Sequence, residues 1–574
     1  MRGNIRLSCM SEDIVLAPQP RRVERLGGNC AADVPVKHQI DAALAEQGYR
    51  LEVSPAQIII SSSTEQGRFY GEQTLAQLRR QFSQSIPALR IEDWPDFAVR
   101  GVMLDVSRDK VPTMQTLLGL VDLLAHLKIN QLQLYTEHTF AYRGHEAVWE
   151  KASPMTGEEI RELDRYCRER FIELVPNQNS FGHMERWLRH RAYEPLAECP
   201  DGFTFPWGVR HKKGFSLNPL DPRSLELIED LFEQLLPNFT SGSINVGCDE
   251  TFDLGLGKSK QECERRGKHR VYLAFLLKIY ELTQKHGKTM QFWGDIILHE
   301  PALIAELPKD VVALNWGYEA DHPFEKETAA FAQAGVPFYV APGTSSWCSC
   351  TGRFDNAVAN LKRAAACGLE NGARGYLNTD WGDIGHLQYL PIAYPGLVAG
   401  AAYSWCLKSN ERIDLAEAMS RHVFHDAAGV LATALLELGN VYQHAHLVPN
   451  GSSVFWSLVG NEERKKLYGP LTEEHFARTE QAIAEALAPL DRARADARDV
   501  SLIKDELRNN AEMLRAGCMR GRLRLRGQNE PSPELRGTLT RIMEEHRRLW
   551  LARNRDGGLS DSLARLEYPL NARP

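Results

Sequence analysis

The sequence predicts an α/β protein built around a (β/α)8 TIM barrel, with a small N-terminal α+β domain and a helical C-terminal region. Eight apolar β-type runs lie between residues 100 and 381. Amphipathic helical stretches separate these runs, an alternation that is typical of parallel barrels. The patterns before and after this stretch differ from it. We therefore place the domains at residues 1–95, 96–408 and 409–574 of the 574-residue chain.

The first 95 residues mix strand and helix signals. Residues 57–60 (QIII) are typical of a buried strand, and residues 67–82 carry apolar side chains at helical spacing. The start of the chain shows no apolar run of signal-peptide length, and no uncharged apolar stretch is long enough to cross a membrane. These observations predict a cytoplasmic protein, unless an export signal has been trimmed from the chain.

The eight β-type runs are RGVMLDVS (100–107), NQLQLY (130–135), IELVPN (172–177), INVGCD (244–249), MQFWGD (290–295), VVALNWG (311–317), PFYVAP (337–342) and ARGYLNTDW (373–381). Between them, segments such as 113–128 and 223–236 have the apolar spacing of crossover helices, so we expect a helix after each strand. The long interval after the third run predicts loops over an active face. After residue 408, the stretches 472–499 and 533–553 indicate helices.

Charge and cysteine usage narrow the range of partners. The chain has 68 Lys and Arg against 75 Asp and Glu, a formal net charge of −7. A mildly acidic protein has no electrostatic footprint for nucleic acid or an anionic membrane. Its 11 Cys lack the density of a disulfide-stapled secreted domain, which favours free thiols in a reducing compartment. We expect a small or neutral ligand.

Acidic and indole side chains gather where the predicted strands end. In a barrel, the carboxyl ends of the strands carry the active site. The relevant run ends are Asp249-Glu250, Trp293-Gly294-Asp295, Asn315-Trp316 and Asp380-Trp381-Gly382-Asp383. Indoles stack on the apolar faces of sugars, and carboxylates accept hydrogen bonds from sugar hydroxyls. The pattern predicts a carbohydrate pocket, although a single Trp at a strand end is more often a core residue.

Three motifs carry a family resemblance: NVGCDE (245–250), FAVRGVMLDVSR (97–108) and FGH (181–183). Together they resemble glycoside hydrolase family 20, the β-N-acetylhexosaminidases, over residues 96–405, and the first domain resembles the domain that precedes the barrel in that family. The resemblance implies removal of terminal β-linked N-acetylglucosamine or N-acetylgalactosamine. It also implies a retaining mechanism in which the substrate's own acetamido oxygen attacks, giving an oxazolinium intermediate. It implies no cofactor and no metal.

The resemblance assigns different tasks to the two adjacent acids. Glu250 would be the general acid and then the base, and Asp249 would orient the acetamido group and offset the charge on its nitrogen. Successive side chains on a strand point to opposite faces. Both acids can therefore reach one ligand only where the strand ends and its pleat breaks.

The remaining substrate-binding positions also follow from the resemblance. Arg100 would grip ring hydroxyls, with a structural ion pair to Asp105 as the alternative. Further expected contacts are Trp293, Trp316 and Trp381 around the acetamido group and the ring, Asp383 at the distal hydroxyls, Glu137 behind the acetamido-binding acid, and His183 beside the general acid. No metal ligands are expected.

Two departures from the family pattern concern the surroundings of the acids. Asn179 and Asn245 stand where the family has an aspartate and a histidine, which removes ionisable partners of the general acid. Run seven ends in residues 341–347 (APGTSSW) and lacks the family tyrosine that contacts the acetamido oxygen. Tyr135 or Tyr376 could supply that hydroxyl, or Trp347 could reshape the pocket, and the sequence leaves these alternatives open.

These features leave three functions to be separated. The first is exo-hydrolysis of an aminosugar-containing glycan or glycoconjugate. The second is a specialised relative that releases a disaccharide or acts on glycolipid, and the third is a catalytically impaired barrel that only binds aminosugars. We expect no nucleic-acid partner and no membrane insertion, and we expect a homodimer as the one protein assembly.

Overall fold

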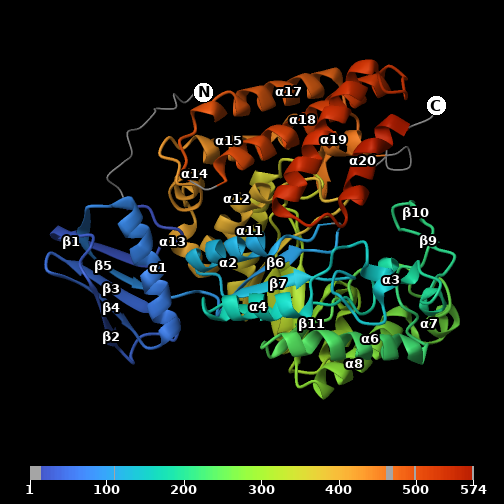
Figure 1. The fold of residues 1–574 in the computed structure, drawn as a ribbon. Coiled ribbons are helices and arrows are strands. Elements are labelled where there is room, and N and C mark those ends of the chain that lie inside the picture. Colours follow the sequence, from blue (N-terminus) through green and yellow to red (C-terminus); the bar gives the residue numbers. More distant parts are fainter. Residues whose placement is uncertain (1–13, 109, 461–468, 497–498, 572–574) are drawn as a thin grey trace.

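The computed structural model describes residues 14–108, 110–460, 469–496 and 499–571, and Figure 1 shows its three parts. Residues 1–13, where an export signal was sought, lie outside the described residues. The first part is a five-stranded sheet in the order β1-β5-β3-β4-β2. Its strands are β1 (Arg22–Ala31), β2 (Val36–Ile40), β3 (Tyr49–Ser54), β4 (Gln57–Ser62) and β5 (Ser85–Asp93). Helix α1 (Glu65–Gln81) packs on this sheet, so the expected α+β unit is confirmed.

Eight parallel strands form the barrel, in the order β11-β12-β13-β14-β15-β6-β7-β8. They are β6 (Val99–Asp105), β7 (Gln131–Tyr135), β8 (Glu173–Val175), β11 (Ser243–Asn245), β12 (Thr289–Trp293), β13 (Val312–Trp316), β14 (Phe338–Ala341) and β15 (Gly375–Asp380). A parallel bridge between Asn177 and Asn245 closes the ring between β8 and β11. Each predicted strand is confirmed, and the fold class with it.

Helices surround the barrel on its outside. They are α2 (Met114–His126), α4 (Gly157–Arg168), α6 (Pro222–Leu235), α8 (Lys268–Lys285), α10 (Phe324–Gln333), α11 (Phe354–Glu370) and α12 (Tyr394–Trp405). Threonine side chains begin two of them: Thr113 caps α2, and Thr156 forms a capping box with Glu159 in α4. The crossover after β12 differs from expectation, because it holds only the short helix α9 (Asp295–Leu298) and a 3-10 turn.

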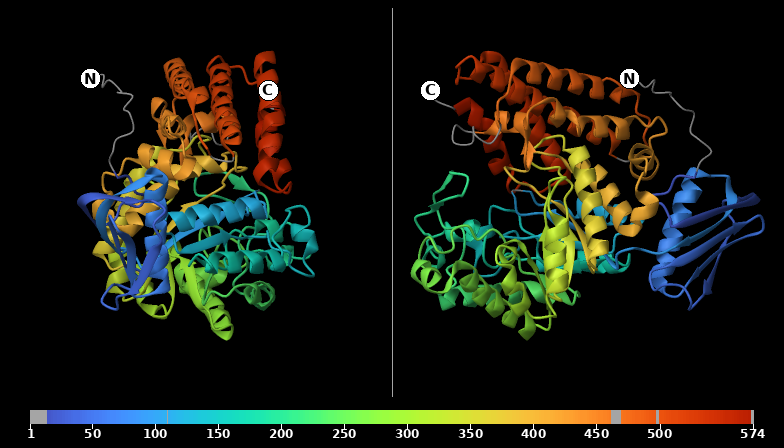
Figure 2. Two further views of the ribbon diagram at one scale, coloured as in Figure 1. Left: turned by 60° about the vertical axis from the view of Figure 1, so that its left-hand side comes forward. Right: turned by 180° about the vertical axis from the view of Figure 1, so that it is seen from behind.

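The C-terminal region is helical and lies over the barrel (Figure 2). It contains α13 (Leu407–Asn410), α14 (Leu415–Met419), α15 (Val430–Leu438), α16 (Ser453–Val459), α17 (Glu473–Leu487), α18 (Val500–Leu525), α19 (Pro533–Arg553) and α20 (Leu559–Asn571). Helix α17 ends before the end of the stretch 472–499, in which residues 497–498 lie outside the described residues. Leu435, Leu507 and Leu539 belong to the same buried cluster as the barrel residues, so the two parts share one core.

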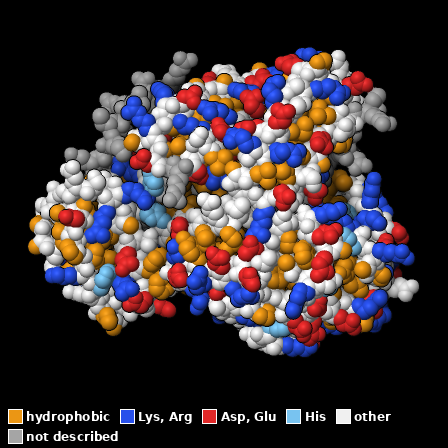
Figure 3. Space-filling model, viewed as in Figure 1, with side chains coloured by type: hydrophobic (Ala, Val, Ile, Leu, Met, Phe, Trp, Pro, Cys, Tyr) orange, Lys and Arg blue, Asp and Glu red, His pale blue; other side chains and the backbone are white. Residues whose placement is uncertain are grey.

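No helix among the residues that the structure describes is both long and apolar enough to span a membrane. Over the face shown in Figure 3, acidic and basic side chains are intermixed and form no field of one sign.

His546 on α19 predicts acid sensitivity of the fold. Its Nδ1 lies 2.7 Å from the Tyr389 hydroxyl and its Nε2 lies 3.0 Å from Ser562 Oγ. Burial lowers the pKa of His546 to about 3, whereas an unfolded histidine has a pKa of about 6.5. The unfolded chain therefore binds an extra proton between these values. The stability that the neutral ring contributes is present above about pH 6.5 and is lost as the pH falls toward 3.

We expect the urea midpoint to fall between about pH 7.5 and about pH 4.5, and to fall less in His546→Gln. Glutamine keeps hydrogen-bonding groups near Tyr389 and Ser562 but does not titrate. An equal fall in both proteins would contradict a role for this histidine.

Candidate active site

One cavity of about 280 Å³ opens among the loops at the carboxyl ends of the barrel strands. Its lining residues are Arg108, His183, Asp249, Glu250, Trp293, Trp316, Gly317, Tyr318, Glu319, His322, Trp381, Asp383, Pro449 and Asn450. The barrel brings these residues together from six strand ends, and Pro449 and Asn450 come from the C-terminal region. This end of a barrel is where its active site lies.

Asp249 and Glu250 both line this cavity because the backbone turns sharply before them. Strand β11 ends at Asn245, and Gly247, Cys248 and Glu250 then have φ values of +69°, +71° and +47°. Such left-handed conformations are costly for residues other than glycine, and they cluster at functional sites. The two acids sit at different depths, since 8% of the Asp249 side chain is exposed against 33% of the Glu250 side chain.

His183 links the two acids. Its Nε2 lies 3.3 Å from Asp249 Oδ2 and 3.3 Å from Glu250 Oε2. Burial lowers the pKa of His183, but the neighbouring Asp249 carboxylate outweighs burial and raises the pKa well above its ordinary value. The imidazole thus lies between the two carboxyl groups and holds their positions relative to each other.

Arg108 lies on the other side of His183 and pairs with three carboxylates. Its Nη2 lies 3.1 Å from His183 Nδ1, and its guanidinium lies 2.9 Å from Glu137, 3.2 Å from Asp105 and 3.5 Å from Asp383. Burial raises the pKa of Glu137 to about 8, although Arg108 acts in the opposite sense. Glu137 itself does not line the cavity and lies behind it.

Asp295, which follows β12, adds a further acid behind Glu250. Its Oδ2 accepts a hydrogen bond from the Glu250 backbone N–H at 3.1 Å. Burial and the nearby Asp249 carboxylate raise the pKa of Asp295 well above its usual range. This hydrogen bond holds the backbone of Glu250 in place.

Aromatic rings wall the cavity. Trp293 and Trp381 have ring centroids 5.8 Å apart, and Trp316 stacks on Tyr318 at 5.2 Å. Trp381 Nε1 donates to the Tyr318 hydroxyl at 2.8 Å. The indole N–H groups of Trp293 and Trp316 and the Oδ1 atom of Asp249 are buried without a hydrogen-bond partner among the described residues. Buried polar groups rarely stay unpaired, and all three of these residues line the cavity.

The expected role of Arg100 in binding the sugar is wrong, because the structure does not bring this residue to the cavity. It lies near the start of β6, at the opposite end of the barrel, where its Nη1 donates to Gln47 at 2.7 Å and its Nη2 to the Tyr70 hydroxyl at 3.0 Å. Its guanidinium also lies 4.9 Å from the Trp405 ring centre. It ties the N-terminal domain to the barrel, and Arg108, which the sequence reasoning missed, pairs with Asp105 and lines the cavity.

The expected alternatives for the missing tyrosine are also corrected. Tyr376 donates to the Leu361 carbonyl at 3.1 Å and is buried away from the cavity. Tyr135 lies beneath Trp381 and donates to Glu137 at 3.0 Å. The tyrosine that lines the cavity is Tyr318, two residues beyond the end of β13. Tyr318 follows the strand end Asn315-Trp316 by two residues, and this position in the sequence could have identified it.

Trp347 is buried and supports the wall from behind. Its ring meets Tyr318 edge to face at 5.0 Å, and it does not line the cavity. Its Nε1 donates to Asn450 Oδ1 at 2.7 Å, while the Asn450 N–H donates to Glu319 at 2.7 Å. A turn of the C-terminal region, between β16 (Leu447–Val448) and β17 (Gly451–Ser452), is thereby held against the cavity. No pattern in the sequence indicates this contribution.

The two asparagines that depart from the family pattern have other partners. Asn179 donates to the Tyr135 hydroxyl, and Asn245 donates to Gln133 at 2.9 Å and accepts from the Gly247 N–H at 3.0 Å. Asn245 thus holds the turn that presents Asp249. His183 and Arg108 supply the ionisable surroundings of the acids in this chain.

His183, Asp249 and Glu250 have ligand atoms within 4.8 Å of one another, a spacing that can hold a metal ion. The spacing of these residues along the sequence predicts no such group. The same three atoms are those that an acid–base mechanism needs, so the geometry alone fits both uses.

The fold and the cavity define a class, a (β/α)8 barrel with paired acids and indole walls at its carboxyl end. Comparison with known families narrows this class. The family described as "Glycosyl hydrolase family 20, catalytic domain" matches residues 97–366, and "Glycosyl hydrolase family 20, domain 2" matches residues 15–94. These two matches cover more than half of the chain. The chain belongs to glycosyl hydrolase family 20.

Individual relatives are distant. A β-hexosaminidase of Akkermansia muciniphila is 28% identical over 321 residues, which are 50% of this chain and 63% of that protein. A lacto-N-biosidase of Bifidobacterium bifidum is 23% identical over 288 residues, which are 48% of this chain and 24% of that protein. The chain thus spans less than two thirds of either relative. A chitobiase structure from Flavobacterium johnsoniae superposes with a TM-score of 0.58 at 17% identity, covering 93% of this chain and 99% of that chain.

Proposed function

We propose that the chain hydrolyses terminal β-linked N-acetylglucosamine or N-acetylgalactosamine from glycans, with retention of configuration. The observation that carries the proposal is the placement of Asp249 and Glu250 in one indole-walled cavity, at different depths and with His183 between them. Family membership and the names of the relatives support the same activity.

In the first step, Glu250 gives its proton to the leaving oxygen as the bond from the anomeric carbon to that oxygen breaks. The acetamido oxygen of the same sugar forms a new bond to the anomeric carbon, which gives an oxazolinium ion. Asp249 Oδ1, which has no partner among the described residues, accepts from the acetamido N–H and offsets its positive charge. Glu250 then takes a proton from a water molecule. The oxygen of that water bonds to the anomeric carbon as the bond from this carbon to the acetamido oxygen breaks, which restores the acetamido group. The two inversions leave the configuration retained.

The other cavity residues hold the sugar in place. Trp293, Trp316 and Trp381 enclose the acetamido group and the ring, while Arg108 and Asp383 bind the ring hydroxyls. Glu137 and His183 act through Arg108 and the two acids, which they position.

A panel of chromogenic substrates tests the proposal. We expect release from the N-acetyl-β-glucosaminide and from its galacto epimer, negligible release from the plain β-glucoside, and inhibition by a thiazoline that copies the cyclised intermediate. A barrel that only binds aminosugars would bind the sugar without release. A disaccharide-releasing enzyme would release chromophore only from a disaccharide glycoside, and comparable rates on the plain glucoside would exclude substrate assistance.

Tyr318 is expected to hydrogen-bond the acetamido oxygen. Its hydroxyl accepts from Trp381 and has Thr379 as a second side-chain partner, so these two groups fix its direction at the cavity wall. Tyr318→Phe should lower kcat by about ten-fold or more, because a hydrogen bond to developing charge is lost. Tyr376→Phe, which removes a hydroxyl outside the cavity, is the matched control. Unchanged kcat in Tyr318→Phe would show that another group contacts the acetamido oxygen.

Chelators are expected to leave the activity intact. The proposed mechanism uses His183, Asp249 and Glu250 as proton carriers and carboxylates, and a bound metal would occupy the same atoms. Rates measured before and after dialysis against EDTA check this. Loss of activity that a divalent ion restores would contradict the absence of a metal cofactor.

We also propose that the enzyme works in the cytoplasm as a homodimer. No disulfide joins the ten cysteines among the described residues to one another, as in reducing compartments. An aminosugar-containing glycan or glycoconjugate is the proposed partner, with no nucleic acid and no membrane insertion. Cell fractionation and light scattering test location and assembly. Recovery of the enzyme mainly outside the cell would contradict the cytoplasmic location, and a monomer in solution would contradict the homodimer.

A further inference from the structure

A second cavity, of about 350 Å³, lies between the barrel loops and the start of α20. Its walls come from the segments after β6 and β7, from the short helices α3 (Glu146–Trp149) and α5 (Glu185–Leu188) with the residues that follow them, and from residues 558–561. None of its lining residues also lines the active-site cavity. Within the part of the chain that the structure describes, the two cavities are therefore separate.

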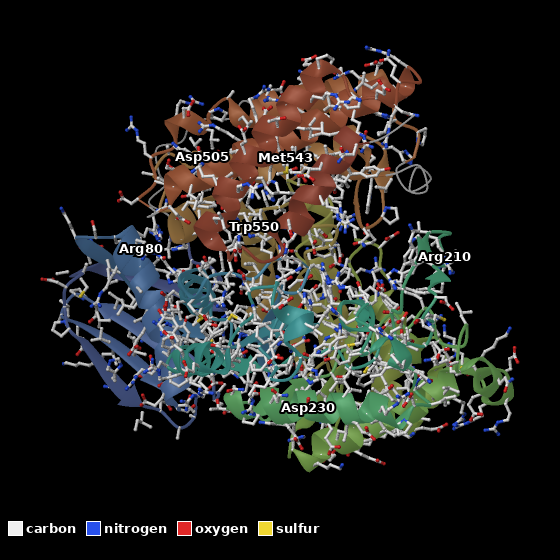
Figure 4. All side chains as sticks on the ribbon, turned by 45° about the vertical axis from the view of Figure 1, so that its right-hand side comes forward. Arg80, Arg210, Asp230, Asp505, Met543 and Trp550 are labelled. Carbon is white, nitrogen blue, oxygen red and sulfur yellow. The ribbon has the colours of Figure 1, made fainter. Side chains whose placement is uncertain are left out.

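The C-terminal side of this cavity is anchored to the barrel. Trp550 of α19, which Figure 4 labels, donates from its indole N–H to the Arg555 carbonyl at 2.7 Å. Arg555 in turn donates to the Pro154 carbonyl at 2.7 Å. Gly557 packs so closely on Ala152 that a side chain at this position would clash with the Ala152 backbone. The segment between α19 and α20 is thus held against the barrel loops, and the cavity is a built part of the fold.

A buried histidine in the cavity wall lacks a hydrogen-bond partner. His138 is 4% exposed, and its Nδ1 atom is buried without a partner among the described residues. Burial lowers the pKa of His138 well below its usual range, and the cations Arg186 and Arg189 act in the same direction. The ring is therefore neutral, with one donor and one acceptor nitrogen. Buried polar groups are usually paired, and an unpaired one beside a cavity is a group that a polar ligand can bind.

The described residues of the wall carry more positive than negative charge. Three basic side chains face two acidic ones, and these five residues are Lys151, Arg186, Arg189, Glu150 and Asp561. One of the acids, Asp561, already lies 2.7 Å from Arg186. Ser560, in the first turn of α20, also lines the cavity. The first N–H groups of a helix have no partner within it and carry partial positive charge. Arg, Lys and helix N-termini are groups with which proteins bind phosphate.

The size of the cavity adds a second constraint. Its volume of about 350 Å³ exceeds the 280 Å³ of the active-site cavity, which the proposed function fills with one pyranose ring. A phosphate ion alone would leave most of this space empty. Ser107 and Thr139 add hydroxyl groups to the wall, and such neutral polar groups suit the hydroxyls of a sugar.

We propose that this cavity is a second binding site, which takes a phosphorylated monosaccharide. Lys151, Arg189 and the first turn of α20 bind the phosphate, and His138 hydrogen-bonds the ligand. A molecule bound there lies outside the cavity that holds Asp249 and Glu250, so it is a ligand and not a substrate.

Calorimetry on the full chain tests the site with three probes, which are glucose 6-phosphate, glucose and inorganic phosphate. Glucose 6-phosphate should bind at one site, and glucose should show no detectable binding. Inorganic phosphate should bind about ten-fold more weakly than glucose 6-phosphate, because it lacks the contacts of the sugar. The Asp249→Ala variant should bind glucose 6-phosphate as the unaltered protein does, since Asp249 lies in the other cavity.

Three variants place the binding in this cavity. Arg189→Gln and Lys151→Met change exposed side chains, and each should weaken binding of glucose 6-phosphate by about three- to ten-fold. His138→Phe keeps a ring but removes both nitrogens, and it should weaken binding as well. Arg191→Gln changes an exposed arginine that does not line the cavity, so it is the matched control and should leave the affinity unchanged.

Several results would overturn the site. These are no binding of glucose 6-phosphate, equal binding of glucose, loss of binding in Asp249→Ala, or unchanged affinity in both Arg189→Gln and Lys151→Met. Inorganic phosphate that binds as tightly as glucose 6-phosphate would contradict a phosphorylated sugar as the ligand. Because every readout is binding, the outcome does not depend on whether the proposed hydrolysis occurs.

Discussion

Glu250→Gln should lower kcat/KM by about two to four orders of magnitude on a disaccharide, and by much less on a nitrophenyl glycoside. The amide keeps the size of the side chain but cannot protonate the leaving oxygen. A nitrophenolate leaves without that proton, whereas a sugar alcohol does not. The dependence on the leaving group is therefore the signature of a general acid, and initial rates on the two substrates measure it.

A variant with the same chemical change on the surface supplies the control. Glu300→Gln removes an exposed carboxylate beyond α9 and should keep full activity. Equal losses on both substrates in Glu250→Gln would show that Glu250 has a structural task, and an altered melting temperature would support that interpretation.

Asp249→Ala should lower turnover of the acetamido substrate by about two to three orders of magnitude, the usual effect of removing one preorganised electrostatic contact. Its Oδ1 atom has no partner among the described residues, while Oδ2 lies 3.3 Å from His183 Nε2. One oxygen thus lies against His183, and the other is a buried acceptor that we propose pairs with the acetamido N–H. Asp249→Asn, which keeps the size but loses the charge, should show a similar loss.

Added azide should not restore the activity of the Asp249→Ala variant, because the nucleophile is part of the substrate and is still present. In an enzyme that uses a carboxylate nucleophile, azide can take the place of that carboxylate once it has been removed. Recovery of a glycosyl azide, or a sugar trapped covalently on Asp249 or Glu250, would contradict substrate assistance even though the fold is that of the family.

The strand pattern could be predicted from the sequence because it depends on local order. Each barrel strand is a short apolar run that is buried on both faces, and such runs stand out between amphipathic helices. The paired acids could be located by the same logic, since a rule of the barrel fold directs attention to strand ends. The turn that lets neighbouring side chains share one cavity was expected as a break in the pleat, and positive φ values at Gly247, Cys248 and Glu250 form it.

Arg100 and Arg108 show where local reasoning stops. Both lie on or next to β6, and a motif match alone favours the one inside the apolar run. The rule that the carboxyl end carries the site favours Arg108, which lies three residues past the end of the strand. The partners of Arg100, among them Gln47 and Trp405, come from parts of the chain that only the folded N-terminal domain and α12 bring near it.

Tyr318 and Asn450 could not be predicted for a related reason. Tyr318 lines the cavity just after β13, and this placement is visible only once the strand ends are arranged around one cavity. Asn450 contacts Glu319 across 131 positions of sequence. No periodicity or motif relates residues so far apart when neither belongs to a repeated pattern.

The turn at Pro449 and Asn450 has a consequence for protein engineering. It reaches the cavity from beyond the last barrel helix, and residues 97–366 are the part that matches the catalytic family. A minimal barrel trimmed after Trp405 would be missing one wall, and a chimera that joins this barrel to another tail would inherit a different wall. Conversely, grafting only the short segment 447–452 offers a way to reshape the cavity while every barrel residue is left as it is.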